Sequence, residues 1–248
     1  MDIFRIDNIP VLASEEALNS TDPLVIVIHG MRTTAETLRL GWPDDKHDGL
    51  ARIYWRLPVL REGRESVLTR RNHDLFNDLF WSVVDESRRE LTRLIAALGR
   101  PSVGLFGFSI GGLISLWGNS DNEQVRASVS VGGVPHLDYL LNFYPDYGWM
   151  TKEVIERRSL VDLRNHMETI ALKPTLILHG LADDQAKWSF MEPFSEALVK
   201  TSSSLHTVQT YPHVRHRLTG ADNELEATEL VNLREDATRW LRAQLTGL

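Results

Sequence analysis

One serine lies in a pattern that is typical of an enzymatic nucleophile. Gly107 and Gly111 flank Ser109, each two residues away from it. An apolar run precedes this triplet at residues 103–106, and apolar residues at helical spacing follow it from Leu113. This arrangement predicts a strand, a sharp turn and a helix, with the serine hydroxyl exposed at the turn. The two glycines would let neighbouring backbone pass close to the serine.

A serine hydroxyl is a weak nucleophile, so it needs a histidine as base and a carboxylate that orients the histidine. In an open α/β sheet such groups gather beyond the carboxyl ends of the strands. Asp183 and Asp184 follow the apolar run at 174–178, and His213 and His216 follow the run at 206–211. The chain therefore supplies serine, acid and histidine in that order, with two candidates for each partner.

The elements that would position these residues alternate along the chain. An alternating stretch at 3–13 predicts a hairpin, whereas unbroken apolar runs predict strands covered on both faces. Periodic apolar residues predict helices, the clearest of which spans 75–99. The polar stretches 43–49 and 59–74 are predicted to be loops. Strands are expected at 24–28, 51–57, 103–106, 125–131, 174–178 and 206–211, and further helices at 190–200 and 224–245. The pattern predicts an α/β fold with a mostly parallel central β-sheet flanked by helices on both faces, in a single domain over residues 1–248.

One interval, residues 134–170, is too long for a plain connection between two strands. We interpret it as a small lid insertion, with residues 134–160 roofing a cleft. Its aromatic residues include Tyr139, Phe143 and Trp149, which we take as candidate substrate-binding residues. Any one of them could instead pack in the core, but their position above the sheet favours a pocket wall.

Composition excludes several classes of function. The 248 residues carry a net charge of −7, which argues against a general affinity for nucleic acid or anionic membranes. No cysteine is present, so disulfides, thiolate metal sites and a cysteine nucleophile are excluded. No apolar run approaches the roughly 20 residues of a membrane helix. No signal peptide is visible at the start, so a cytoplasmic location is expected.

Two other groups of residues could do chemistry. His213 and His216 could form half of a metal site, but no matching cluster of histidines or acids accompanies them, so we expect neither a metal nor a cofactor. Four arginines between 59 and 74 could meet an acidic group of a substrate, although a solvated loop is the simpler interpretation. These are Arg61, Arg64, Arg70 and Arg71.

With these motifs identified, the sequence resembles the α/β-hydrolase superfamily over nearly its whole length. Within it, the chain is most similar to small bacterial carboxylesterases of the dienelactone-hydrolase and prolyl-oligopeptidase-like branch. The resemblance implies that Ser109 is the nucleophile. It implies that Asp183 is the acid, because Asp183 completes a Gly-x-x-Asp motif that begins at Gly180. It implies that His216 is the base, because Arg217 and an apolar residue follow it.

The same resemblance implies an oxyanion hole made of two backbone N–H groups. One belongs to Ile110, directly after the nucleophile, and the other to Met31, in the loop after the first central strand. Each would stabilise the transition state by about 3 kcal/mol. The chain departs from its relatives at Arg215, where a small or acidic residue is common, and this arginine would affect the pKa of the neighbouring base.

These features together predict a serine esterase that forms an acyl-enzyme intermediate and acts on an ester of modest size. The same residues would serve a thioesterase or a hydrolase of small amides or peptides. Outside enzymes, the fold could belong to a ligand-binding or scaffold protein that has no turnover. A complete set of serine, acid and histidine favours the enzyme.

Overall fold

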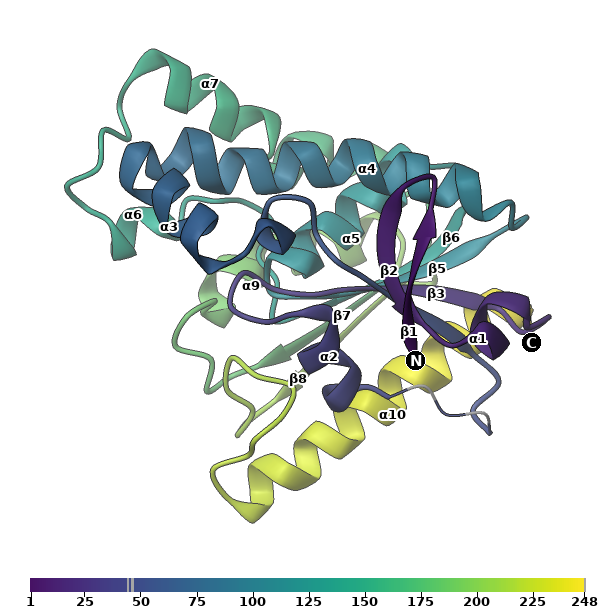
Figure 1. The fold of residues 1–248 in the computed structure, drawn as a ribbon. Coiled ribbons are helices and arrows are strands. Elements are labelled where there is room, and N and C mark those ends of the chain that lie inside the picture. Colours follow the sequence, from purple (N-terminus) through teal and green to yellow (C-terminus); the bar gives the residue numbers. More distant parts are fainter. Residues whose placement is uncertain (44, 46, 248) are drawn as a thin grey trace.

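The computed structural model describes residues 1–43, 45 and 47–247, and its centre is one eight-stranded sheet (Figure 1). The strand order is β1-β2-β4-β3-β5-β6-β7-β8. The hairpin β1–β2 is antiparallel and also pairs antiparallel with β4, whereas all pairs from β4 to β8 are parallel. The mostly parallel sheet is therefore confirmed. The strands are β1 (Asp2–Ile6), β2 (Ile9–Ala13), β3 (Leu24–Ile28), β4 (Ala51–Trp55), β5 (Val103–Phe108), β6 (Val125–Val131), β7 (Thr175–Gly180) and β8 (His206–Tyr211).

Helices cover both faces of this sheet, as Figure 1 shows. The α-helices are α1 (Glu15–Asn19), α2 (Ala35–Gly41), α3 (Arg64–His73), α4 (Ser82–Leu98), α5 (Ile110–Asp121), α6 (Leu140–Phe143), α7 (Lys152–Leu160), α8 (Met167–Ile170), α9 (Trp188–Thr201) and α10 (Glu224–Thr246). Short 3-10 turns are η1 (Leu60–Glu62) and η3 (Leu163–His166), and a π-helical segment is η2 (Leu75–Trp81). Within the described residues, no helix combines the length and the apolar character that crossing a membrane requires.

The unbroken apolar run of β3 explains how both faces of the sheet are buried. Successive side chains of a strand point to opposite faces. Leu24, Ile26 and Ile28 pack into the core with α4, α5 and α9, whereas Val25 and Val27 pack into the core with α2 and α10. Each strand of this kind contributes to two apolar layers, and the layers hold the carboxyl ends of the strands at one edge.

Of two predictions about the segment before the serine strand, one is wrong and one is confirmed. Residues 59–74 form η1 and α3 rather than a loop. Helix α3 buries none of its residues, so apolar periodicity could not predict it, and a bidentate ion pair between Arg70 and Glu62 secures it instead. The helix predicted at 75–99 is confirmed: the chain is helical from the π-helical η2, which Asp74 caps, through α4, and Gly99 ends it in the left-handed conformation. The predicted loop at 43–49 includes residues 44 and 46, which lie outside the described residues.

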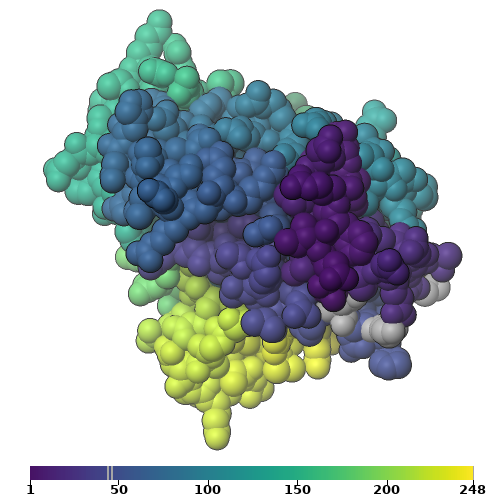
Figure 2. All heavy atoms as spheres, viewed as in Figure 1, coloured from purple at the N-terminus to yellow at the C-terminus, as the bar shows by residue number. Residues whose placement is uncertain are grey.

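The predicted insertion folds into helices between β6 and β7. It carries α6, α7, η3 and α8, and in Figure 1 α6 and α7 lie beyond one end of the sheet, near α3 and the start of α4. The hydroxyl of Tyr147 in the insertion donates a hydrogen bond to the carboxylate of Asp74, so the insertion is joined to the turn between α3 and η2. Figure 2 shows the two segments adjoining on the surface, the insertion in teal and α3 in blue.

Candidate active site

Ser109 lies at the sharp turn between β5 and α5, as its flanking glycines predict. Its backbone has φ 59° and ψ −124°, a conformation that non-glycine residues rarely adopt. A Cβ on Gly107 would lie 1.9 Å from the carbonyl oxygen of Gly111, and a Cβ on Gly111 would lie 2.3 Å from the carbonyl oxygen of Ile28. Only glycines allow this approach of β3, β5 and α5, and the approach holds the strained serine beyond the end of the sheet.

His216 stands between Ser109 and Asp183. Its Nε2 lies 2.8 Å from Oγ of Ser109, and its Nδ1 lies 2.6 Å from Oδ2 of Asp183. The carboxylate can only accept, so Nδ1 carries the proton and Nε2 is free to accept the serine proton. The ring of Phe108 lies 5.1 Å from the imidazole ring and flanks it. The histidine comes from the loop after β8 and the acid from the loop after β7, at the strand ends where the sequence predicts them.

The carboxylate of Asp183 is buried and fully engaged. Its Oδ1 accepts hydrogen bonds from the backbone N–H groups of Gln185 at 2.9 Å and Ala186 at 2.8 Å. A second histidine supports the same loop, because Nε2 of His179 donates to the carbonyl oxygen of Ala186 at 2.6 Å. Burial lowers the pKa of His179, which keeps its imidazole neutral. This loop gives the acid one orientation, with Oδ2 directed at His216.

The alternative candidates lie elsewhere. Asp184 is exposed and makes no hydrogen bond within the described part of the chain. The Nδ1 atom of His213 lies 2.7 Å from a carboxylate oxygen of Glu229 on α10. The guanidinium of Arg215 lies 3.6 Å from a carboxylate oxygen of Asp222. Over the ranges that the structure describes, no group of three or more His, Asp or Glu side chains could hold a metal ion.

Hydrogen bonds fix the loop after β3 in a conformation that suits an oxyanion hole. The carbonyl oxygen of Gly30 accepts from Nδ1 of His29 at 2.9 Å, and the N–H of Gly30 donates to Oγ1 of Thr33 at 2.8 Å. Nε2 of the buried His29 accepts the N–H of Leu57 at 3.2 Å, and burial lowers the pKa of this histidine. The next N–H, that of Met31, and the N–H of Ile110 have no acceptor among the described residues.

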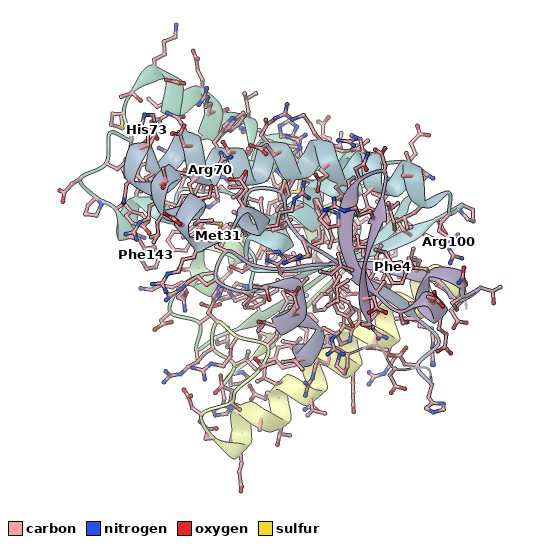
Figure 3. The ribbon with its side chains drawn as sticks, viewed as in Figure 1. Phe4, Met31, Arg70, His73, Arg100 and Phe143 are labelled. Carbon is pink, nitrogen blue, oxygen red and sulfur yellow. The ribbon has the colours of Figure 1, made fainter. Side chains whose placement is uncertain are left out.

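A cavity of about 700 Å³ adjoins these groups. Ser109, His216, Met31 and Ile110 all line it, together with apolar side chains of the insertion. Figure 3 shows Met31 and Phe143 at the same end of the molecule, on the side of the sheet that carries α3 and α4.

Two of the three aromatic candidates reach this cavity, and the third does not. Tyr139 and Phe143 line it, and their rings contact each other edge to face at 6.2 Å. Trp149 is buried elsewhere, with its ring packed at 5.7 Å against Phe76 and its Nε1 donating to a backbone carbonyl of the insertion. The interpretation of Trp149 as a substrate-binding residue is therefore corrected: its large apolar ring fixes the insertion to η2.

The opposite wall of the cavity consists of Val67, Leu68 and Arg71 from α3 and Leu79 and Phe80 from η2. The sequence analysis named Arg71 as a residue that could meet an acidic group of a substrate, but it did not predict the apolar part of this wall. The signal that could have indicated it is weak, since α3 carries only two apolar residues in its central turn. The capping aspartate before η2 marks a helix start but does not indicate a binding surface.

Comparisons with known proteins agree with this architecture. A model of the prolyl oligopeptidase family matches residues 97–242, a span that includes Ser109, Asp183 and His216. Esterase YjfP of Escherichia coli (strain K12) is 27% identical over 155 residues, and the match covers 56% of this chain and 62% of that esterase. The alignment thus spans less than two thirds of the relative.

Solved structures show the same fold. The protein TT1662 from Thermus thermophilus aligns with a TM-score of 0.71 and 18% identity, covering 96% of this chain and 99% of that one. A putative dienelactone hydrolase from Klebsiella pneumoniae gives 0.67 and 19%, covering 98% of each chain. An acylaminoacyl peptidase from Pyrococcus horikoshii gives 0.66 and 15%, covering 98% of this chain but 41% of the peptidase. The fold is the α/β-hydrolase fold.

Proposed function

Because the chain belongs to the prolyl oligopeptidase family, we propose that it is a serine hydrolase that cleaves carboxylic esters, with Ser109, His216 and Asp183 as its catalytic triad. The observation that carries the proposal is the pair of hydrogen-bond distances on one imidazole, 2.8 Å to the serine and 2.6 Å to the acid. A serine that served only the turn would need neither a histidine nor a buried carboxylate behind it.

In the first half of the reaction, Oγ of Ser109 attacks the ester carbonyl while Nε2 of His216 takes its proton. The imidazolium that forms is stabilised by the carboxylate of Asp183, which remains ionised. The carbonyl oxygen becomes an oxyanion and accepts hydrogen bonds from the N–H groups of Met31 and Ile110. Collapse of this intermediate breaks the ester C–O bond, and His216 gives its proton to the departing alcohol.

In the second half, water replaces the alcohol. His216 takes a proton from the water, and the resulting hydroxide attacks the acyl-serine carbonyl. The same two N–H groups hold the second oxyanion. Return of the proton to Ser109 releases the carboxylic acid, so one ester and one water give one acid and one alcohol.

An ester substrate of modest size is supported by two facts. The cavity of about 700 Å³ has mostly apolar walls, including Leu79, Phe80 and Leu113, which suit an aliphatic or aromatic group. The curated relative that matches is named an esterase. A peptide substrate is a weaker candidate, because the acylaminoacyl peptidase that shares the fold has more than half of its chain outside the match.

The proposal is tested with a series of p-nitrophenyl esters of increasing acyl length and with a fluorophosphonate probe. We expect the wild-type protein to hydrolyse the shorter esters and to be labelled once, and Ser109→Ala to lose both properties. Equal turnover by Ser109→Ala, or no labelling of the folded wild-type protein, would refute the serine-hydrolase assignment.

A further inference from the structure

The charged residues that line the cavity are of one sign. Arg32 and Arg71 both line it, and among its described lining residues there is no aspartate, glutamate or lysine. The protein as a whole carries a net charge of −7, so the cavity is locally positive on a chain that is otherwise acidic. A cleft that served only neutral esters would gain nothing from two guanidinium groups, whereas a cleft of this sign concentrates anions.

Arg71 lies in the last turn of α3, and its guanidinium has no ion pair with any described residue. It lies 5.8 Å from the ring of Tyr144, a residue of the insertion that also lines the cavity. Its neighbour Arg70 is bound to Glu62 through two hydrogen bonds of 3.0 and 2.8 Å. A positive charge in the last turn of a helix interacts favourably with the helix dipole, but Arg70 already supplies such a charge and stabilises α3. The structural role of Arg70 leaves Arg71 available for a ligand.

Arg32 reaches the cavity from the other wall. It follows Met31, whose N–H is one of the two proposed oxyanion donors, so its Cα lies about 3.8 Å from that of Met31. It is exposed and forms no ion pair with the described residues. The two arginines therefore come from the loop after β3 and from α3, and both line one cavity. A planar guanidinium fork matches a carboxylate with two parallel hydrogen bonds.

We propose, on the basis of the serine-hydrolase function above, that the preferred substrates are esters that carry a free carboxylate, which Arg71 and Arg32 bind. The carboxylate takes no part in the bond changes. It positions the scissile ester at Ser109, while the apolar walls hold the carbon chain between the two ends. Because this contact is the same in the ground state and in the transition state, its loss should raise KM more than it lowers kcat.

The test uses pairs of esters with equal shape and different charge. On the acyl side the pair is p-nitrophenyl hydrogen adipate and p-nitrophenyl 6-methylheptanoate. On the alcohol side it is 4-carboxyphenyl butyrate and 4-isopropylphenyl butyrate. We expect a higher kcat/KM for the anionic member of at least one pair, and this pair identifies the side of the ester that carries the carboxylate. In Arg71→Gln the anionic-to-neutral ratio should fall about five- to tenfold, chiefly through KM.

A matched control removes the same charge from the same helix. Arg64 is exposed on the first turn of α3 and does not line the cavity. Arg64→Gln should keep the wild-type ratio, and the double variant Arg71→Gln/Arg32→Gln should lower the ratio further than Arg71→Gln alone. High salt should lower the anionic-to-neutral ratio of the wild type, because the ion pair between the arginines and the substrate carboxylate lies near the surface and is screened.

Failure of this inference can be told apart from failure of the esterase proposal. Hydrolysis of the neutral esters with ratios near one, unchanged in Arg71→Gln, would overturn the carboxylate site and leave the esterase intact. Binding of the same esters to Ser109→Ala, measured by calorimetry, does not depend on turnover. Tighter binding of the anionic ester to Ser109→Ala that is lost in the double variant Ser109→Ala/Arg71→Gln supports the site even if no ester is hydrolysed. Equal affinity for both members of each pair refutes it.

Discussion

Replacing Asp183 with asparagine should abolish most of the catalysis without unfolding the loop. The Oδ1 of the new amide can still accept from the N–H groups of Gln185 and Ala186, which lie 2.9 and 2.8 Å away. The amide NH₂ then faces Nδ1 of His216 at the position of the present 2.6 Å contact. Two donors cannot share that contact, so the imidazole must move its proton to Nε2.

A proton on Nε2 points at Oγ of Ser109 and removes the general base. From the effect of this change in serine proteases, kcat should fall about 10⁴-fold, which is about 5.5 kcal/mol in the activation barrier. Asp184→Asn is the matched control, since it makes the same chemical change one residue along on an exposed side chain. We expect its kcat to stay within about twofold of the wild type.

The assay is steady-state hydrolysis of a short p-nitrophenyl ester, with the urea midpoint of each variant measured in parallel. Two results would refute the reasoning. One is a kcat within tenfold of wild type in folded Asp183→Asn. The other is a larger loss in Asp184→Asn, which would move the acid to the exposed position and contradict the hydrogen bonds to His216.

Three further predictions concern the scaffold of the site. Gly107→Ala should destabilise the fold by about 3 kcal/mol or more and lower kcat, because its Cβ would lie 1.9 Å from the Gly111 carbonyl oxygen; urea unfolding and ester turnover measure both effects. Tyr147→Phe removes the hydrogen bond to Asp74 and should cost about 1–2 kcal/mol in unfolding free energy, and an unchanged urea midpoint would contradict this. Burial lowers the pKa of His206 below its usual 6.5, so the unfolded chain binds the proton first. The unfolding free energy should therefore fall as the pH drops below about 6.5, and His206→Gln should reduce that slope in urea titrations between about pH 5 and 8.

The parts of the fold that follow from the sequence are those whose signal is local. Strands β3, β6 and β8 have the predicted bounds. In β3 an apolar run covered on both faces begins and ends where the burial does, whereas β8, at the edge of the sheet, buries only its first and last residues. The turn at Ser109 is equally local, since strand, glycines and helix are adjacent in the chain. The positions of Asp183 and His216 follow from topology, because parallel strands bring their carboxyl ends to one edge.

The choice between adjacent candidates needed more than local signal. Asp183 and Asp184 have the same chemistry and nearly the same place in the chain. The structure separates them through burial and through two backbone N–H groups that a composition pattern cannot indicate. Likewise, His213 lies against Glu229, a residue of a helix that follows it in the chain.

The walls of the cavity were the least predictable part for a physical reason. Helix α3 is secured by charge pairs and buries no residue, so no apolar pattern marks it. Trp149 could be placed above the sheet from the sequence, but its contact with Phe76 joins residues 73 positions apart, and the insertion that carries Trp149 has no repeating periodicity. The proposed catalytic groups are fixed by the sheet, whereas the residues proposed to select a substrate come from such segments. Arg71 illustrates the consequence: it is one of four arginines in a stretch predicted to be a loop, and only the packing of α3 against the insertion distinguishes it from Arg70, which serves the helix.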